Sequence, residues 1–485
     1  MKHILFSLRI TAIVSFSPVV FTLLCNTLYA ETPKVDCNII LITIDTLRAD
    51  HLSCYGYHRN TSPTIDKIAE EGIRFTNAIA PSSWTSPSMA SLMTSFYPIS
   101  HGVRRGFLRN GKVYEQEALN EEFYTLAEIL KKHGYTTFGA VANIHMAEEL
   151  GFGQGFDYYY CEGFDEAVAL NNVVFSWKDK IGNSEKFFLW MHYIDPHDEY
   201  KVRSPWTNDY AAESWIGNTH LSKKTMKELR TLIPLIKQKN NVLEYLIALY
   251  DSEINYVDYH IGNLMYRLGL DKNALIIITS DHGEEFLGHG SLGHGNSLYQ
   301  ELINVPLIIK PPFASHEPTI RVNHKPVSII GIIPTILGVL GITPPQEIKG
   351  ENLLEKMKER RAQRHDYLFS ELTQWYIINT IIKSGWKYIY NTCTQQEELY
   401  DITKDHDELR NLIHQEALIA NELKNALFNW ASTSPKAPAT KKKIDSSKEI
   451  EEKLNALGYI ANGEHEKLKQ PSESCNLGIC HSFAN

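Results

Sequence analysis

The sequence predicts an α/β fold with a doubly wound, mostly parallel sheet and a small α+β subdomain near the C-terminus. Two short apolar runs, residues 38–44 and 274–280, carry the first part of this prediction. Continuous apolar runs of this length are typical of parallel strands that are buried on both faces. From residue 38 to about residue 340, strand-like and helix-like segments alternate without a linker, as they would in one large doubly wound unit.

The chain has 485 residues, which is more than one average domain. We expect a signal peptide over residues 1–30, the α/β domain over 35–360, the C-terminal subdomain over 365–432, and a polar, partly disordered tail over 433–485. The tail prediction rests on the Lys- and Ser-rich composition of its first part and on the scarcity of apolar residues near its end.

The N-terminal segment has the features of a cleaved signal peptide. Lys2 and Arg9 precede an apolar run over residues 10–24, which Pro18 interrupts. A membrane span needs about 20 apolar residues, so we expect no stable span after cleavage. The protein should be exported, either to the periplasm or out of the cell.

The net charge bears on the expected partners, and the cysteine content bears on the expected compartment. The net charge is −9, and no basic stripe with interleaved aromatic residues is present, so nucleic acid is not expected as a partner. Six cysteines remain after residue 30, an even number that suits an oxidising compartment. Cys475 and Cys480 are placed to close a small loop in the tail, and the pairing of the others stays open.

Thr85 lies where a helix is expected to begin. A polar turn precedes it, Pro87 suits the first turn of a helix, and apolar residues continue with helical spacing after Ser88. The free N–H groups and the dipole at a helix N-terminus favour an anion next to the Thr85 hydroxyl. A Thr or Ser in such a place is commonly only a helix cap, and this segment alone leaves both interpretations open.

Metal-binding side chains follow the two apolar strands. Asp45 ends the first strand, and Asp281 and His282 end the second. Sites in open α/β sheets form at the carboxyl ends of strands. Beside the helix-start hydroxyl of Thr85, these side chains predict a metal site.

Several ordered motifs resemble the sulfatase-type members of the alkaline phosphatase superfamily, and the resemblance covers nearly the whole chain. Thr85 to Met89 resembles the nucleophile signature of that family, Cys or Ser-x-Pro-Ser-Arg. The other matching segments are residues 44–57, 279–285, 293–299, 305–309, 385–388, 398–401 and 411–412. The resemblance implies an alkaline phosphatase-like fold, hydrolysis of sulfate or phosphate esters, and a divalent metal ion.

Thr85 and Met89 depart from the family pattern. Sulfatases oxidise the signature Cys or Ser to formylglycine, but Thr85 carries a methyl group at the carbon concerned, and Met89 replaces the signature arginine. We therefore expect Thr85 to attack as an ordinary alkoxide, with water breaking the resulting covalent ester. This chemistry favours phosphate esters, while sulfate esters stay open.

The predicted metal ligands depart from the pattern as well. Thr46 stands where many sulfatases have a second aspartate, and His282 stands where many have asparagine. A set of Asp45, Asp281, His282 and Thr85 suits Mn²⁺ or Zn²⁺ better than an all-oxygen Ca²⁺ cage. One divalent ion is expected, with Mn, Zn, Ca and Mg all open.

Four further residues are candidate substrate contacts. By resemblance, His197 binds the anion or protonates the leaving group, and His294 grips the anion. Asn143 is either a donor to a phosphate or sulfate oxygen or a turn residue at a strand end. His192 is either a substrate contact or a core histidine. The helix-prone insertion at residues 211–239 is expected to shape substrate access.

The sequence thus favours a metal-dependent hydrolase of sulfate or phosphate esters that uses Thr85 rather than formylglycine. The substrate would be a small molecule, or an ester on a glycan or lipid. Two alternatives are a phosphoryl or lipid-headgroup transferase and a non-catalytic, sulfatase-like protein that binds glycans. The transferases usually carry several transmembrane helices, which this sequence does not predict. A non-catalytic binding protein is disfavoured because the chain retains the candidate site residues Asp45, Asp281, His282 and His294.

Overall fold

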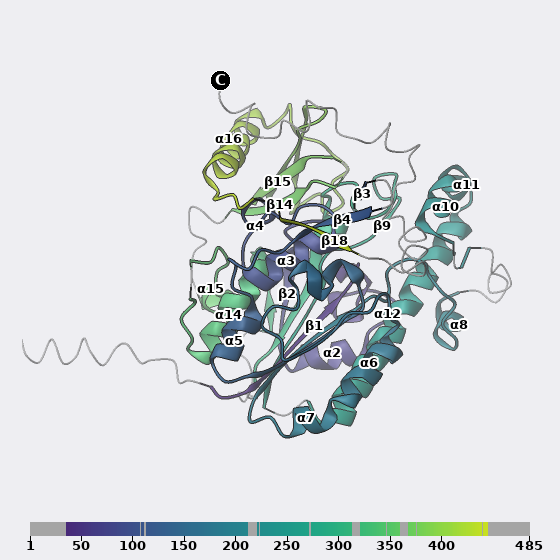
Figure 1. The fold of residues 1–485 in the computed structure, drawn as a ribbon. Helices are drawn as coiled ribbons and strands as arrows, with labels where there is room; N and C mark the ends of the chain where they lie inside the picture. Colours follow the sequence, from purple (N-terminus) through teal and green to yellow (C-terminus); the bar gives the residue numbers. More distant parts are fainter. Residues whose placement is uncertain are drawn as a thin grey trace, which may run out of the picture.

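The computed structural model describes most of residues 35–444, and Figure 1 shows its fold. Within this range it leaves out residues 107, 111–112, 212–220, 223, 271–272, 313–320, 346, 359–366, 375 and 439. The predicted signal peptide, the tail after residue 444 and the proposed Cys475–Cys480 loop lie outside the described residues.

A nine-stranded sheet forms the centre of the molecule, with the order β12-β2-β11-β8-β1-β7-β5-β6 and β13 pairing with β2. The strand β1 (Asn38–Ile44) runs parallel to both β7 (Phe187–Tyr193) and β8 (Ala274–Thr279). The strand β5 (Thr136–Val141) runs parallel to β7 and β6 (Tyr158–Tyr160), whereas β11 (Asn304–Lys310) is antiparallel to β8 and β2 (Ile73–Ile79). The predicted doubly wound, mostly parallel sheet is confirmed.

Alternate residues of β1 face two different apolar cores. Ile39 and Leu41 pack in one core with helices α3 (Thr85–Thr94), α5 (Leu126–Lys132) and α14 (Ile332–Leu340). Ile40 and Ile42 pack in the other core with α2 (Pro63–Glu70), α6 (Ala167–Ser176) and α12 (Asn240–Leu268). Successive side chains of a strand point to opposite faces, so a continuous apolar run lets helices cover both faces of the sheet (Figure 1).

A second, antiparallel sheet lies in the C-terminal region. Its strands are β14 (Leu368–Leu372), β15 (Ile378–Lys383), β16 (Trp386–Asn391) and β17 (Gln396–Asp401), in that order. The helix α16 (Ala417–Thr433) packs on this sheet and lies at the top of Figure 1. This arrangement confirms the predicted α+β character of the region.

Strand β14 is tied to the segment that leads to α3. The hydroxyl of Ser370 donates to the carbonyl of Ala80 across 2.5 Å, and the amide of Glu371 donates to the carbonyl of Pro81 across 2.9 Å. The carboxylate of Glu371 accepts from the amide of Ile99 at 2.8 Å. The C-terminal sheet therefore holds the turn that precedes Thr85.

A strand not expected from the sequence opens the predicted polar tail. This strand, β18 (Thr440–Ile444), pairs with β4 (Val113–Ala118), which in turn pairs with β3 (Leu108–Asn110). The remaining elements are α4 (Pro98–His101), α7 (Lys178–Gly182), α8 (Trp206–Tyr210), α10 (Met226–Thr231), α11 (Ile233–Gln238), α13 (Gln300–Ile303), α15 (Leu353–Lys358), β9 (Glu285–Phe286), β10 (Leu292–Gly293), β12 (Val322–Asn323) and β13 (Val327–Ser328). The described residues also form five short 3-10 helices, Ala49–His51, Ser53–Tyr55, Ile144–Met146, Glu148–Leu150 and Ile329–Gly331.

The sequence predicted no stable membrane span after signal cleavage and left the cysteine pairing open. None of the helices in the described part of the chain is both long and apolar enough to cross a membrane. Cys393 is disulfide-bonded, and Cys37, Cys54 and Cys161 are free thiols.

Candidate active site

Thr85 is the first residue of α3 and is fully buried. The residue in the N-cap position is Trp84, and no side chain caps this helix. Thr85 Oγ1 instead lies 3.2 Å from Nε2 of His282. Thr85 is therefore not a helix cap, and its hydroxyl faces the strand-end residues that the sequence predicted as metal ligands.

His282 presents a lone pair to Thr85. Its Nδ1 lies 3.0 Å from the carbonyl oxygen of Gly283, which can only accept a hydrogen bond. The Nδ1 hydrogen is fixed by this contact, so the neutral ring has an unprotonated Nε2. Such a nitrogen can accept the hydroxyl hydrogen of Thr85 or ligate a metal ion.

Asp45 and Asp281 meet because their strands are neighbours. Strands β1 and β8 are parallel, with Thr43 opposite Thr279, so the two aspartates follow at the same edge of the sheet. Oδ1 of Asp281 accepts from the backbone amides of Thr46 at 3.2 Å and His282 at 2.9 Å. The other oxygen, Oδ2, is buried without a hydrogen bond and lies 3.3 Å from Nε2 of His282.

The two carboxyl groups affect each other's ionisation. Burial raises the pKa of Asp281, and the charge of Asp45 raises it further. Burial also opposes ionisation of Asp45, but the neighbouring His192 and the charge of His197 outweigh it and hold the pKa of Asp45 far below its usual range. Two buried carboxylates this close repel each other unless a cation lies between them.

Three buried oxygens around these strand ends lack a hydrogen bond within the described structure. They are Oδ1 of Asp45, Oγ1 of Thr46 and Oδ2 of Asp281. Thr46 has a left-handed backbone, with φ of 56°, which a β-branched residue rarely adopts and which is typical of functional sites. Oxygens left without partners, beside the imidazole of His282, fit the donor set of a divalent cation.

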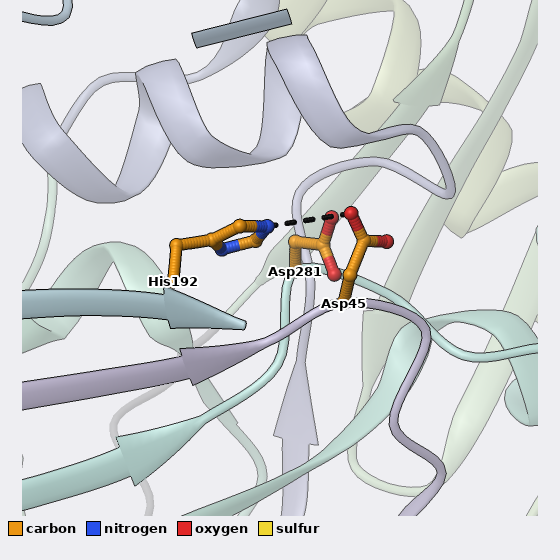
Figure 2. A group of neighbouring side chains, drawn as sticks. All are labelled: Asp45, His192 and Asp281. Atoms are coloured by element: carbon orange, nitrogen blue, oxygen red, sulfur yellow. Dashed lines mark hydrogen bonds and ion pairs between the residues drawn. The ribbon is translucent and has the colours of Figure 1, made fainter. Parts of the chain in front are cut away.

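His192 belongs to the same group. One ligand atom from each of Asp45, His192 and Asp281 lies within 4.8 Å of the other two. Figure 2 shows these three side chains together. The hydroxyl of Thr43 donates to the carbonyl of Met191, so it accepts from Nδ1 of His192 at 2.8 Å. Nε2 of His192 then faces Oδ2 of Asp45 at 3.3 Å. Two lone pairs in that position need a proton or a cation between them. The structure therefore places His192 against the possible metal site.

Asn143 also contacts Asp45. It follows β5, and its Nδ2 donates to Oδ2 of Asp45 at 2.7 Å. Its Oδ1 accepts from the amide of His145 at 3.1 Å. The sequence offered a substrate donor or a turn residue, and the observed contacts make Asn143 a residue that orients Asp45.

Three histidine rings lie next to one another beside Thr85. The ring centroids of His282 and His294 are 4.5 Å apart, and those of His294 and His197 are 4.8 Å apart. Nδ1 of His197 donates to the carbonyl of Asp198 at 2.8 Å and lies 3.0 Å from its carboxylate. The structure thus brings both sequence-predicted histidines, His197 and His294, to the predicted ligand His282.

Opposite pKa shifts distinguish two of these histidines. Burial alone would lower the pKa of His197, but the carboxylates of Asp198 and Asp45 raise it to about 10. Burial, together with the neighbouring His282 and His197, holds the pKa of His294 well below its usual value. At neutral pH His197 is a cation and His294 is uncharged.

Glu284 is a site residue that the sequence interpretation did not single out. Its Oε1 lies 3.0 Å from Nδ1 of His294. Burial and the charge of Asp198 raise the pKa of Glu284 to about 8, so it carries a proton at neutral pH and donates it to Nδ1. Nε2 of His294 then bears the hydrogen. In the sequence, the one indication of this role was the position of Glu284, an acidic residue two positions after the predicted ligand His282.

Comparison with known proteins identifies the family. A model of the sulfatase family matches residues 37–342, more than half of the chain. The chain belongs to the sulfatase family. A second model, for the C-terminal region of N-sulphoglucosamine sulphohydrolase, matches residues 293–432 of this sulfatase-family protein. The family prediction from sequence is confirmed, and the protein is a hydrolase acting on sulfate or phosphate esters.

Two sulfatase relatives match most of the length of this sulfatase-family chain. It is 28% identical over 400 residues to an ulvan-active sulfatase of Formosa agariphila, which covers 74% of this chain and 73% of that protein. It is 24% identical over 452 residues to the uncharacterized sulfatase YidJ of Escherichia coli. That match covers 81% of this chain and 86% of YidJ.

Two solved structures share the fold. A 2-O GAG sulfatase superposes with a TM-score of 0.64 at 20% identity and covers 82% of this chain and 92% of its own. The phosphonate monoester hydrolase of Agrobacterium radiobacter superposes with a TM-score of 0.63 at 18% identity. The superposition covers 82% of this chain and 96% of the hydrolase chain.

Proposed function

We propose that this protein is a metal-dependent hydrolase in which Thr85 itself attacks a phosphate or sulfate ester, with phosphate preferred. The observation that carries this proposal is the position of the Thr85 hydroxyl. It lies at the start of α3, makes no capping bond, and is 3.2 Å from Nε2 of His282. The buried carboxylates of Asp45 and Asp281 lie beside that nitrogen.

Asp45, Asp281, His282 and Thr85 would hold one divalent ion. Imidazole nitrogen beside carboxylate and hydroxyl oxygen favours Mn²⁺ or Zn²⁺ over Ca²⁺ or Mg²⁺. When bound, such an ion lowers the pKa of a ligating hydroxyl and neutralises charge on the transferred group. His192 and Asn143 contact Asp45 and fix its orientation, as partners of metal ligands commonly do.

Attack by Thr85 gives a two-step reaction. Thr85 enters as the alkoxide, and a bond forms from Oγ1 to the central phosphorus or sulfur while the bond from that atom to the leaving oxygen breaks. Water then attacks the central atom, the bond to Oγ1 breaks, and inorganic phosphate or sulfate departs. The free N–H groups at the start of α3 favour the negative charge that develops.

His197 is the proposed acid, and His294 the proposed anion contact. His197 is a buried cation at neutral pH, so it has a proton to give to the leaving oxygen. It regains that proton from the attacking water in the second step. Neutral His294 is held by Glu284 and donates from Nε2 to an oxygen of the ester.

The proposed substrate is an ester on a glycan, by analogy with the ulvan-active relative. We also propose that the protein is exported. The disulfide at Cys393 supports this, because disulfides persist in oxidising compartments.

Metal content and turnover on one purified sample test the proposed function. The sample is assayed with nitrophenyl phosphate, nitrophenyl phosphodiester and nitrophenyl sulfate, before and after dialysis against a chelator. We expect about one divalent ion per chain and turnover that disappears with the metal and returns with Mn²⁺ or Zn²⁺. A metal-free sample with full activity would overturn the metal assignment. Fast turnover of the sulfate alone would overturn the preference for phosphate.

A further inference from the structure

A cavity of about 370 Å³ is lined by side chains that the proposed chemistry does not use. They are Arg230, Ser291, Asn296, Tyr376, Ile378 and Asn391. Three separate parts of the chain meet here: the helix α10 of the insertion, the loop around β10, and strands β15 and β16 of the C-terminal sheet with the residues just before them.

Arg230 is held so that part of its guanidinium group stays available. Its Nε donates to the carbonyl of Leu292 at 3.0 Å. The side chain packs on Gly293, where a Cβ would come within 2.9 Å of Nη2. Among the described residues, no carboxylate forms an ion pair with Arg230, and neither Nη1 nor Nη2 makes a hydrogen bond. A fixed arginine of this kind is suited to bind an anionic oxygen group with two parallel hydrogen bonds.

The other lining residues add no negative charge. Ser291, Asn296, Tyr376 and Asn391 offer hydroxyl and amide groups, and Ile378 is apolar. The charge of the cavity wall is therefore that of Arg230. Hydroxyl and amide groups around one cation suit a hydroxyl-rich ligand that also carries an anion.

The same loop connects this cavity to the nucleophile. Gly295 lies against the Trp84 ring, where a Cβ would come within 2.5 Å of it, and the hydroxyl of Ser83 donates to the carbonyl of Ser297 at 2.7 Å. Asn296, which lines the cavity, lies between these two contacts. The ring of Trp84 is also 5.5 Å from that of His294. The loop that lines the cavity therefore also contacts Ser83 and Trp84, the two residues that precede Thr85.

We infer that this cavity binds a second anionic group on the substrate, a carboxylate or a second sulfate, through Arg230. The inference rests on the proposed function and narrows its substrate class to esters of acidic sugars. The group to be cleaved lies at Thr85, and the second anion lies on Arg230.

The test compares neutral and acidic sugars that carry the same ester. Glucose and glucuronate bearing the ester on O2, O3 or O4 supply the neutral and carboxylate arms. Glucose that bears the ester at the same positions and an additional sulfate on O6 supplies the sulfate arm. For the wild type, kcat/KM should be at least tenfold higher for an acidic form than for the neutral form at one of these positions. The arm that shows the preference identifies the anion.

Substitution of Arg230 then tests the residue. Arg230→Gln should reduce the ratio of kcat/KM for the acidic sugar to kcat/KM for the neutral sugar at least tenfold. Arg230→Lys should give an intermediate ratio, because it keeps the positive charge but loses the planar guanidinium group that can donate two parallel hydrogen bonds. Lys227→Gln is the matched control. Lys227 is exposed on the same helix, does not line the cavity, and its removal should leave the ratio at the wild-type value.

Two outcomes would overturn the inference. A wild type without any preference for acidic sugars would show that the cavity binds no second anion. Equal losses on neutral and acidic sugars in Arg230→Gln would show that Arg230 only holds the loop at Leu292. Failure of the proposed function is distinguishable, because then the wild type would turn over neither nitrophenyl esters nor any sugar ester.

Discussion

Asn143 donates a hydrogen bond from Nδ2 to Oδ2 of Asp45 across 2.7 Å, and both side chains are fully buried. The bond uses one oxygen of Asp45 and leaves Oδ1 without a hydrogen bond. Since Oδ1 lies 3.8 Å from Nε2 of His282, Asn143 decides which carboxylate oxygen faces the proposed ligand His282.

Replacement of Asn143 by alanine should weaken metal binding. Loss of a group that orients a metal ligand typically costs ten- to a hundredfold in affinity. Competition with a chelator measures the change, and Asn171→Ala is the control, because Asn171 is also buried but donates to the carbonyl of His260. A higher KM for the ester with unchanged metal affinity would instead make Asn143 a substrate contact.

Asp281→Ala should release the metal ion altogether. The variant loses a buried carboxylate oxygen that has no other partner. Elemental analysis of the purified variant should find far less than one ion per chain, and activity should fall with it. The control is Asp258→Ala, because Asp258 is equally buried but accepts from the amides of Thr64 and Ile65. If Asp281→Ala kept a full ion and full activity, the ligand assignment would be wrong.

Thr85→Ala should lower kcat by several orders of magnitude, as expected for loss of a nucleophile. Thr85→Ser keeps the hydroxyl and should retain measurable turnover. Mass spectrometry of the wild type should find unmodified threonine at position 85, and a transient adduct of one phosphate or sulfate during turnover. An aldehyde at this position, or an active alanine variant, would contradict direct attack by Thr85.

His197→Ala should slow the cleavage of alkyl esters far more than that of nitrophenyl esters, because a nitrophenyl group leaves without a proton. His294→Ala should slow both alike, because an anion contact serves every ester. In the wild type, alkyl ester turnover should fall at alkaline pH. The raised pKa of His197, about 10, means that the acid is present below that pH and is lost above it. Equal losses on both ester classes in His197→Ala would reject it as the acid.

Arg203→Met should destabilise the loop that carries His197. The guanidinium group of Arg203 pairs with Glu253 at 2.6 Å, Asp195 at 2.6 Å and Glu166 at 2.9 Å. Removing one partner from a buried ion pair costs about 3–5 kcal/mol, here because Asp195 and Glu253 are left buried and unpaired. Denaturant unfolding measures the loss. Lys201→Met removes a half-exposed partner of Glu166 and should cost no more than about 1 kcal/mol.

The strand ends and the helix start were predictable because they are local. An apolar run followed by Asp45, and another followed by Asp281 and His282, shows in sequence where a parallel strand ends. The contacts of His192 and Asn143 with Asp45 were not predictable in the same way. They depend on the register between β1 and β7, where Thr43 lies opposite His192, and on where β5 ends in the sheet.

Two further features lay beyond local patterns. Strand β18 has the composition of a solvated tail, and its pairing with β4 is a long-range contact that the local sequence does not indicate. Glu284 is adjacent to a motif whose functional positions were already assigned, and its role follows from a contact with His294 that only the folded chain shows.

The bonds from Ser370 and Glu371 to Ala80 and Pro81 have a consequence for motion. An edge strand held only by side-chain packing can separate in a local fluctuation while the rest of the protein stays folded. Here β14 cannot leave without breaking the carbonyl contacts of the turn that leads to Thr85, and the amide of Ile99 would lose its partner as well. Local opening of β14 therefore costs these three hydrogen bonds, which couples the C-terminal sheet to the turn that leads into α3.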